Sequence, residues 1–490
     1  MSIVEYVRPE LTAILPKYQL LRDLLKGELA VKAAKTTYLP VPNVDVQETD
    51  ERYKAYILRA VLYNVTARTL EGLTGQIFLR DPVTEVPTEL EPLLENANGA
   101  NITLTQMSKR SSRRALAYGR GGLFTDFPTM GRDITRAEIN SGQVSAVINA
   151  YAPWDITNWY PIKLGTKVVL GMVVLREYED SLDEFEIETK VRYRVLRLTS
   201  TGTLVEVWSK NQTDELAITE QYTLRGADGE ALNELPFDFI GSDNNDSEID
   251  EPPLYDMGSL NMAHYRNSAD FEESCFMLGQ PTPYFWGLTQ QWVDDVLKGT
   301  VVLGSRAAVM LPEKGGGGLL QANPNTLARE AMQDKQEQMF ALGAKLVKER
   351  RVERTATEAE LESASENSVL STVAKNVSQA YTKALQRAAN YVGIDGSEIK
   401  FELNTNFDLT SMTAEELRIV LEGWATFDAI ATTEMREAVR RSGLGNLPDA
   451  EYEAQIIKDQ ELKSKLNFNK VQQEADNRST TATGVDSNGS

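Results

Sequence analysis

Apolar residues recur at helical spacing through the first 80 residues of the chain. Steps of three and four carry them from Tyr53 to Leu73, and the pattern runs toward Gly75. A second helical pattern covers about residues 104–118 and ends at the glycine-rich run 119–122, where the chain is expected to reverse into an apolar run. The N-terminal part is therefore predicted to be helical.

Residues 144–240 have the alternating pattern of strands. Val191, Tyr193 and Val195 alternate with arginines, which is the period-two pattern of a half-buried strand. An apolar strand is also predicted over residues 168–175. We predict an antiparallel β-rich subdomain with one solvent-facing side.

Two long helices are predicted on either side of a short insertion. The first spans Tyr255–Leu278, and the second spans Leu327 to about Arg350. The insertion, Trp286–Asn325, has strand-like apolar runs between residues 301 and 311, and its glycine run Gly315–Gly318 is predicted to be a flexible tip. This pattern places the insertion at the end of a two-helix stalk.

The longest helical pattern comes next, with apolar residues at steps of three and four leading to Val392. Thr357 and Glu360 would form a capping box at its start, and Gly393 is a natural C-terminal stop. A helix from Ala356 to Val392 would extend about 55 Å at ~1.5 Å per residue. A helix of that length usually crosses a larger assembly or packs against copies of itself.

The C-terminal part is predicted to be helical at first. A capping box at Thr413 and Glu416 opens it, and the run 443–448 interrupts it. Residues 469–490 are rich in Ser, Thr, Asn and Gly and have no apolar period, so we expect them to be disordered.

Composition narrows the class of protein. A chain of 490 residues is too long for one ordinary core, so roughly two to four domains or subdomains are expected. The net charge is 51 − 72 = −21, which argues against a broad basic face that wraps nucleic acid. A single cysteine and a single histidine exclude a disulfide scaffold and zinc sites built on Cys/His clusters. Without a basic start before an apolar block, or a spanning-length apolar stretch, we expect folding in a reducing cytoplasm and no membrane partner.

The only cysteine and the only histidine do not form a catalytic dyad. His264 and Cys275 fall on one predicted helix, eleven residues and roughly 16 Å apart along its axis. A catalytic hydrogen bond needs about 3 Å. The pattern instead favours a polar helix residue and a small buried thiol.

No loop has the sequence of a phosphate or calcium site. A P-loop motif is missing, and neither glycine run lies between a strand and a helix. The acidic run 243–251 would need Gly at position 248 and Glu at 254 to bind calcium as an EF-hand, but it has Glu248 and Leu254. A solvated, flexible linker is therefore favoured there, and no catalytic residue, cofactor site or metal site is predicted.

One cluster of charges opposes the overall sign. Lys345, Lys348, Arg350, Arg351 and Arg354 lie within ten residues, where one predicted helix ends and the next begins. Positive charge is favourable at a helix C-terminus and needs no ligand. The functional alternative is a basic loop that meets phosphates.

Several segments, taken in order, resemble the portal proteins of tailed bacteriophages. They extend over about residues 50 to 440, and their order along the chain carries the resemblance. The segments are Tyr63-Asn64, 69–75, 117–120, 151–159, 252–266, 268–270, 354–359 and 368–370.

The resemblance implies an α+β, portal-like fold. Its parts would be a wing with a helical and a β-rich portion, a two-helix stem that brackets a small α/β clip, a tunnel loop, a long wing helix and a helical crown. The implied bounds are 1–253 for the wing, 254–284 for the first stem helix, 285–325 for the clip, 326–350 for the second stem helix, 351–410 for the tunnel loop and long wing helix, 411–468 for the crown and 469–490 for the disordered tail.

The resemblance also implies a structural function without enzyme activity or cofactor. Portal proteins form rings, commonly of twelve subunits, at one capsid vertex of the virion, after assembly in the host cytoplasm. Double-stranded DNA is packaged and ejected through the ring without sequence specificity, and terminase, capsid or scaffold proteins and head–tail adaptors dock on it. Lys348, Arg350, Arg351 and Arg354 are then the candidates to face DNA in the tunnel loop, although they could equally bind carboxylates of a neighbouring subunit.

Two other classes remain open from the sequence. A cytoplasmic hydrolase with carboxylate or lysine chemistry would be a monomer or small oligomer with one deep pocket lined by titratable groups. A scaffold or adaptor protein that conducts no DNA would lack an axial channel.

Overall fold

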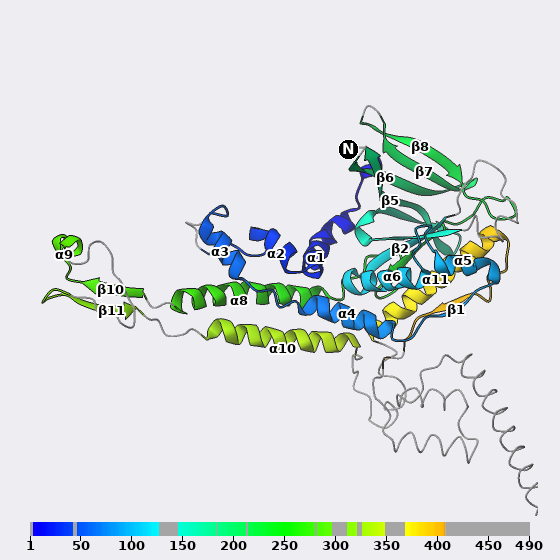
Figure 1. Ribbon diagram of the computed structural model, residues 1–490. Coiled ribbons are helices and arrows are strands. Elements are labelled where there is room, and N and C mark those ends of the chain that lie inside the picture. Colours follow the sequence, from blue (N-terminus) through cyan, green and yellow to red (C-terminus); the bar gives the residue numbers. More distant parts are fainter. Residues whose placement is uncertain are drawn as a thin grey trace, which may run out of the picture. The chain divides into compact units, whose positions relative to one another are not determined.

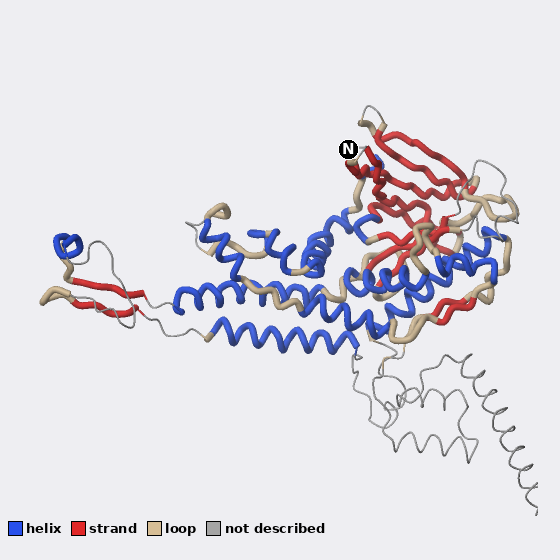
Figure 2. Tube along the Cα trace, viewed as in Figure 1, coloured by secondary structure: helices blue, strands red, loops and turns tan. Residues whose placement is uncertain are grey.

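The computed structural model describes residues 3–42, 47–126, 146–183, 185–211, 214–279, 282–295, 311–320, 326–347, 368–405 and 407. The chain divides into two units, Met1–Phe407 and Asp408–Ser490, and the described residues all belong to the first. The predicted crown and tail, the Thr357–Glu360 capping box and the strand-like run at 301–310 lie outside the described residues. The first unit mixes helices and antiparallel sheets, so the α+β class is confirmed (Figures 1 and 2).

Helices dominate the N-terminal part, as predicted. The apolar pattern from Tyr53 to Leu73 is divided between two helices, because the chain leaves the helical conformation after Arg59 and Asn64 caps the next helix by accepting a hydrogen bond from the Ala67 amide. The elements in order are η1 (Ile3–Glu5), α1 (Pro9–Lys26), α2 (Glu28–Ala33), η2 (Lys35–Thr37), α3 (Glu51–Arg59), α4 (Val65–Ile77), η3 (Thr88–Leu90), α5 (Glu91–Glu95) and α6 (Leu104–Tyr118).

Helix α6 begins and ends where the sequence predicts. Thr103 and Gln106 form a capping box at its start. Gly119 closes the helix with φ of 70°, a left-handed conformation that only glycine adopts readily. The reversal leads into β2 (Arg120–Asp126), which is buried along its whole length.

The predicted antiparallel β region forms two sheets. A three-stranded sheet has the order β3-β2-β9, and a five-stranded sheet has the order β4-β5-β6-β7-β8. Two short antiparallel pairs, β1-β12 and β10-β11, lie elsewhere. The strands are β1 (Val83–Glu85), β3 (Val147–Tyr151), β4 (Ile156–Leu164), β5 (Lys167–Asp183), β6 (Glu186–Thr199), β7 (Gly202–Lys210), β8 (Leu216–Thr223), β9 (Phe237–Gly241), β10 (Thr282–Trp286), β11 (Gly316–Leu320) and β12 (Lys400–Glu402). The short 3-10 turn η4 (Pro153–Asp155) joins β3 to β4.

The predicted long helix is shorter than its pattern suggested. The helix that ends at Val392, α11, begins at Val369, so its 24 residues extend about 36 Å. Ser368 has an extended ψ of 156°, and its hydroxyl accepts a hydrogen bond from the Ser371 amide, which is the geometry of an N-cap. The expectation of one helix from Ala356 to Val392 is therefore wrong at its N-terminal end.

Helix α11 forms the centre of the main core. Half of its residues are buried, and they meet α6, β2, β9 and β12. Tyr381 is fully buried, and its hydroxyl lies 2.9 Å from that of Ser111 on α6. A second core cluster joins α1, α2 and α3 to the helix α8 (Tyr255–Gly279) through residues such as Leu24, Tyr53 and Tyr265.

The acidic segment 243–251 exposes most of its charged side chains, as expected, but its backbone is held in a packed loop and is not a flexible linker. Asp250 accepts a hydrogen bond from the Asp243 amide at 2.8 Å, and the Asn245 side chain donates to the Asn376 carbonyl of α11 at 2.9 Å. The guanidinium of Arg120, only 2% exposed, donates to the carbonyls of Ser247 and Glu248. Composition indicated a loop, but the buried arginine that holds it could not be recognised from the sequence.

Along the described part of the chain, every helix falls short of the length and apolar character that crossing a bilayer requires.

Candidate functional site: the two-helix stem and its hairpin

Two helices, α8 and α10 (Leu327–Val347), lie side by side, and the β10-β11 hairpin comes between them in the chain (Figure 1). They run antiparallel, because His264 meets Gln336 while Met257, nearer the start of α8, meets Gly343, nearer the end of α10. We call this helix pair the stem. It has the predicted form of two helices bracketing a small insertion.

Helix α8 is fastened to the N-terminal helices by buried polar contacts. The Asn261 side chain accepts from the Thr66 amide at 3.1 Å and donates to the Tyr63 carbonyl at 2.8 Å. Further along, Ser268 bonds to both backbone groups of Val61. These contacts fix α8 against the rest of the first unit.

Helix α10 is far less covered. Among its residues 327–346, Met339 alone is fully buried. Leu327 and Phe340 are more than half exposed, as are Phe276 and Met277 near the end of α8. A helix that leaves so much of its surface in solvent is poorly stabilised by one neighbour, since tertiary packing supplies most helical stability in proteins.

The only histidine lies between the stem helices. Its ring is 2% exposed and stands 5.8 Å from the ring of Tyr63. The Gln336 amide nitrogen lies 3.1 Å from Nε2 of His264 and donates to it, so the neutral ring carries its proton on Nδ1, which has no partner among the described residues. Burial, and then the charge of Lys335, lower the pKa of His264.

We expect the stability of the stem to fall in mild acid because of His264. A histidine whose pKa is lower in the folded state binds its proton more readily when unfolded, so stability is full above about pH 6.5 and declines as the pH falls below it. The chain has no other histidine, so denaturant unfolding at pH 7.5 and 5.5, compared between the unaltered chain and a His264 variant, reports on this group. In the His264→Gln variant, the fall in the free energy of unfolding between pH 7.5 and pH 5.5 should disappear. An unchanged fall in that variant would contradict the assignment to His264.

The glycine run is part of a strand and not a flexible tip. Glycines 316–318 belong to β11, where Trp286 pairs with Gly316 and Tyr284 pairs with Gly318. The rings of Tyr284 and Trp286 stack with centroids 5.6 Å apart, and both side chains are about half exposed. A Cβ on Gly317 would come within 2.6 Å of the Phe285 ring, and one on Gly318 within 3.0 Å of the Tyr284 ring. The aromatic rings thus lie against the glycines, so the absence of side chains in this run makes room for the rings and does not make the segment flexible.

The hairpin should not tolerate a side chain at Gly316. The Trp286 ring occupies the place of a Cβ there, and an isolated two-stranded hairpin is only marginally stable. In Gly316→Val we expect amide exchange of residues 282–286 to accelerate about tenfold or more, which corresponds to ~1.4 kcal/mol. The matched control is Gly75→Ala on α4, where no atom lies within 4 Å of the new Cβ. Equal exchange in the two variants would rule out the ring packing.

The predicted basic cluster begins at the end of α10. Lys345 is exposed in its last turn. Lys348, Arg350, Arg351 and Arg354 lie outside the described residues, so their position stays a prediction. Their segment connects two described points, Val347 of α10 and the N-cap Ser368 of α11.

The other candidate sites from the sequence do not form a reactive site among the described residues. The Cys275 thiol is exposed toward the end of α8, so the expectation of a buried thiol is wrong. Gly119 and the glycines that follow form a helix cap and a buried strand. Within the described ranges, no group of three or more metal-ligating side chains comes together.

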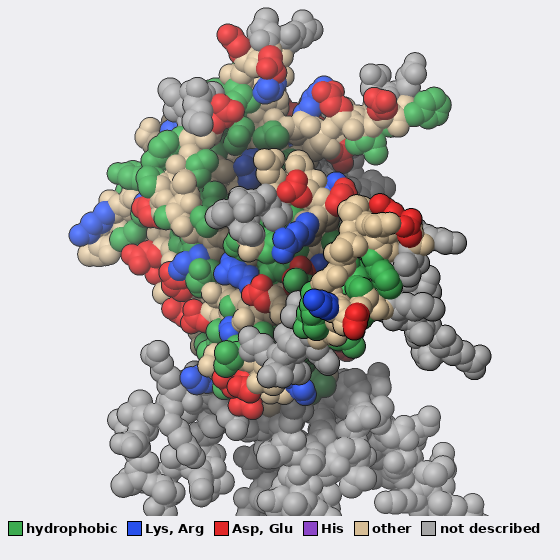
Figure 3. All heavy atoms as spheres, turned by 90° about the vertical axis from the view of Figure 1, so that its left-hand side faces the viewer, with side chains coloured by type: hydrophobic (Ala, Val, Ile, Leu, Met, Phe, Trp, Pro, Cys, Tyr) green, Lys and Arg blue, Asp and Glu red, His purple; other side chains and the backbone are tan. Residues whose placement is uncertain are grey.

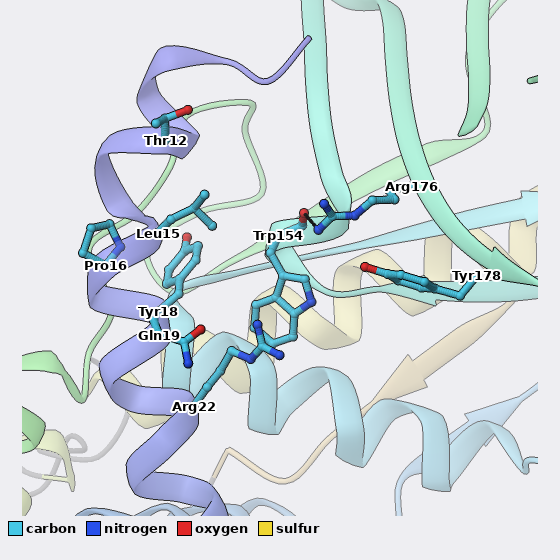
Figure 4. Close-up of a pocket in the computed structure, with 9 residues that line it drawn as sticks. All are labelled: Thr12, Leu15, Pro16, Tyr18, Gln19, Arg22, Trp154, Arg176 and Tyr178. Atoms are coloured by element: carbon cyan, nitrogen blue, oxygen red, sulfur yellow. Dashed lines mark hydrogen bonds between the residues drawn. The ribbon is translucent and has the colours of Figure 1, made fainter. Parts of the chain in front are cut away.

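A surface cavity of about 460 Å³ lies between α1, the turn η4 and the second half of β5 (Figure 4). The Arg22 guanidinium stacks 4.4 Å from the Trp154 ring, and Arg176 donates to the Trp154 carbonyl at 2.9 Å. The lining contains no carboxylate, histidine or cysteine, and burial raises the pKa of its Tyr18 and Tyr178. This cavity suits an anionic group better than it suits general base catalysis.

The stem lies within the part of the chain that matches a family model. Residues 253–392 match the family model of a domain of unknown function, DUF4055. This domain is associated with phages, so the match supports a phage protein. It covers less than a third of the chain and extends from the start of α8 to the end of α11. No curated protein matches the chain.

Proposed function

We propose that this chain is the subunit of a ring that conducts double-stranded DNA through one vertex of a tailed-phage capsid, as portal proteins do. The observation that carries the proposal is the order of elements in residues 253–392: a first stem helix, an outlying hairpin, a second antiparallel stem helix, a connecting segment with basic residues and a buried helix. This is the order of stem, clip, tunnel loop and wing helix that the sequence resemblance implies.

The exposure of α10 supports assembly into a ring. Over residues 327–346 every side chain but that of Met339 keeps contact with solvent, and the apolar Leu327 and Phe340 are more than half exposed. Identical neighbours on either side of the stem would cover this surface. A head-to-tail contact of that kind generates a closed ring when the rotation between copies closes.

The charge of the stem suits a conduit in which DNA slides. Helices α8 and α10 carry seven acidic residues against four basic ones. Figure 3, in which the left-hand side of Figure 1 faces the viewer, shows acidic and basic side chains interspersed over that face. Twelve copies would have a formal charge of 12 × −21 = −252. Such a ring repels phosphates over most of its surface, which limits the salt-dependent adhesion that would slow DNA.

The proposal assigns the remaining tasks to other proteins. A terminase would supply the ATP-driven force, and capsid or scaffold proteins and a head–tail adaptor would dock on the ring in the virion. The proposed ring itself would have no catalytic function.

Negative-stain imaging and mass measurement of the purified chain test the proposal. We expect rings of about twelve subunits with a central hole, which distinguishes a conduit from both a hydrolase and a solid scaffold. A homogeneous monomer at high protein concentration across a range of salt would overturn the proposal.

A second experiment tests the tunnel-loop residues separately. Replacing Arg350, Arg351 and Arg354 with Ala should leave ring formation intact and impair DNA packaging or retention. The matched control is Lys345→Ala in the described last turn of α10. If rings of the triple variant package DNA normally, these arginines do not act on DNA in the tunnel loop, and the proposed ring is unaffected.

A further inference from the structure

Strands β5 and β6 continue beyond the sheet that contains them. Strand β4 pairs with β5 only as far as Leu175, and β7 pairs with β6 only from Tyr193 onward. Beyond these points β5 and β6 pair only with each other, out to Asp183 and Glu186. We call residues 176–192 the ribbon; its eight β5 residues extend about 26 Å at ~3.3 Å each.

One face of the ribbon has exposed apolar side chains, with the hydrogen-bonded pair Asp180–Thr189 between them. The cross-strand pairs Tyr178–Val191 and Leu182–Ile187 share this face, because they are separated by an even number of residues. Leu182 and Ile187 are 73% and 69% exposed, and Phe185 at the turn is 96% exposed. Two strands with exposed apolar side chains and two unpaired edges are unstable against association, so such a ribbon needs a partner surface.

The ribbon is also strongly acidic. Between Tyr178 and Lys190 the sequence has six acidic residues and one basic residue. Glu186 and Glu188 are both exposed, and among the described residues only Lys190 pairs with one of them, Glu188, at 3.0 Å. Glu186 and Glu188 alternate with Ile187, so they lie on the opposite face, and apolar and acidic groups come together at the turn, where Phe185 stands beside Glu186. The partner surface of this tip should therefore combine apolar and basic groups.

Such a surface exists on α6 and the end of α4. Lys109, Arg110 and Arg113 stand at steps of three and four on the outer face of α6, and none of them has an ion-pair partner among the described residues. The Lys109 ammonium lies 5.9 Å from the Phe78 ring, and the neighbouring Leu79 is 65% exposed. Three cations on one helix without an ion-pair partner in the described part of the chain, one of them beside an aromatic ring, are unusual on a chain of net charge −21.

We propose that the ribbon of one copy docks on the α6–α4 surface of the next copy. The two surfaces complement each other in charge and in apolar content, and every copy carries both. Two different patches that bind each other join copies head to tail, and such contacts close into rings. The inference rests on the proposed ring assembly and assigns to the wing a contact that is additional to the stem.

Charge exchange tests the pairing directly. The ribbon variant Glu186→Lys/Glu188→Lys and the helix variant Lys109→Glu/Arg110→Glu should each lower the ring fraction about tenfold or more at moderate salt. Combining all four substitutions should restore rings, because the attraction is re-formed with reversed signs. The matched control Glu220→Lys/Glu230→Lys changes charge equally at exposed sites outside the ribbon and should leave rings unchanged.

The outcomes separate this inference from the proposed function. If the unaltered chain forms no rings, the proposed function fails. If it forms rings and both reversed variants do so equally well, the ribbon contact is wrong and the ring stands. Two impaired variants without rescue on combination would also overturn the pairing, since the surfaces would then serve different partners.

Cross-linking provides a test that does not depend on charge. On a Cys275→Ser background, Phe185→Cys and Leu79→Cys should give covalent ladders with a short bismaleimide only when both substitutions are present. Ladders from either single variant, or none from the double variant in assembled rings, would place the ribbon on another surface. Loss of capsid or adaptor binding with intact rings would identify such a protein as the occupant and exclude a second copy.

Discussion

Arg120→Ala is expected to lower the free energy of unfolding by about 3–5 kcal/mol. The guanidinium is buried between the rings of Trp159 and Phe239, at 4.4 and 4.1 Å, and it donates to two carbonyls of the acidic loop. Burial lowers the pKa of Arg120 to about 10, so the group is still charged at neutral pH. Removing it leaves a cavity and two unsatisfied carbonyls at the segment that leads into α8.

Denaturant unfolding followed by tryptophan fluorescence measures this effect. Arg120→Lys keeps the charge but not the two-pronged donor, so it should fall between the alanine variant and the unaltered chain. The control is Arg225→Ala, an exposed arginine that donates to the Gly229 carbonyl and should change stability by less than about 0.5 kcal/mol. A similarly small change for Arg120→Ala would show that the loop is held by other contacts.

Glu177→Ala is expected to lower the free energy of unfolding by a similar amount, about 3–5 kcal/mol. Its carboxylate accepts from the Nε atoms of Arg192 and Arg194, both at 2.8 Å, and from the Tyr151 hydroxyl at 2.5 Å. The side chains of Glu177 and Arg194 are only 12% and 13% exposed. Without the carboxylate, the positive charge of Arg194 stays buried with fewer partners at the base of the ribbon.

The pH dependence distinguishes this ion pair from simple packing. Burial raises the pKa of Glu177, but the hydrogen bond and charge of Arg194 outweigh it and bring the pKa below its ordinary value. The stabilisation is therefore present above about pH 4.5 and is lost as the pH falls through the lowered pKa. The difference between the unaltered chain and Glu177→Ala should shrink toward pH 3. A constant difference from pH 7 to pH 3 would contradict the charge argument, and Glu188→Ala on the exposed part of β6 serves as the control.

The ion-pair network around Glu177 lies at the base of the ribbon. Glu177 and Arg192 form a cross-strand pair on the polar face of the ribbon, opposite to the face of Tyr178 and Val191. The network thus stiffens the base of an arm whose outer apolar side chains, Leu182 and Ile187, are exposed. A stiff arm loses less conformational entropy on docking than a mobile loop of the same length.

Local patterns predicted the elements well and their limits less well. Helix α6 could be delimited because its helical pattern and its C-terminal glycine are local signals. The apolar pattern of α11 located its C-terminus and its buried face. Its N-terminus was placed too early, because a second plausible capping box at Thr357 could not be ranked against Ser368 without knowing which residues the core covers.

The glycine run and the acidic loop show a different limit. Both were interpreted from composition, which describes the intrinsic freedom of a segment and not the groups that pack on it. Three aromatic rings lie across Gly316–Gly318, and Arg120 holds the loop from a strand more than a hundred residues earlier. The exposed thiol of Cys275 was missed for the same reason, since burial depends on neighbours distant in the chain.

By itself, the sequence determined the α+β class, the helix pair around an insertion, the antiparallel β region and the absence of a disulfide framework. These depend on periodicity, end signals and residue counts, which act within a few turns of chain. Only the tertiary structure decided that α10 stays largely uncovered, that β5 and β6 leave their sheet as a ribbon with apolar and acidic side chains, and that α6 gathers cations without an ion-pair partner among the described residues. Burial and charge pairing are sums over contacts between distant segments, so they exist only once the chain has folded.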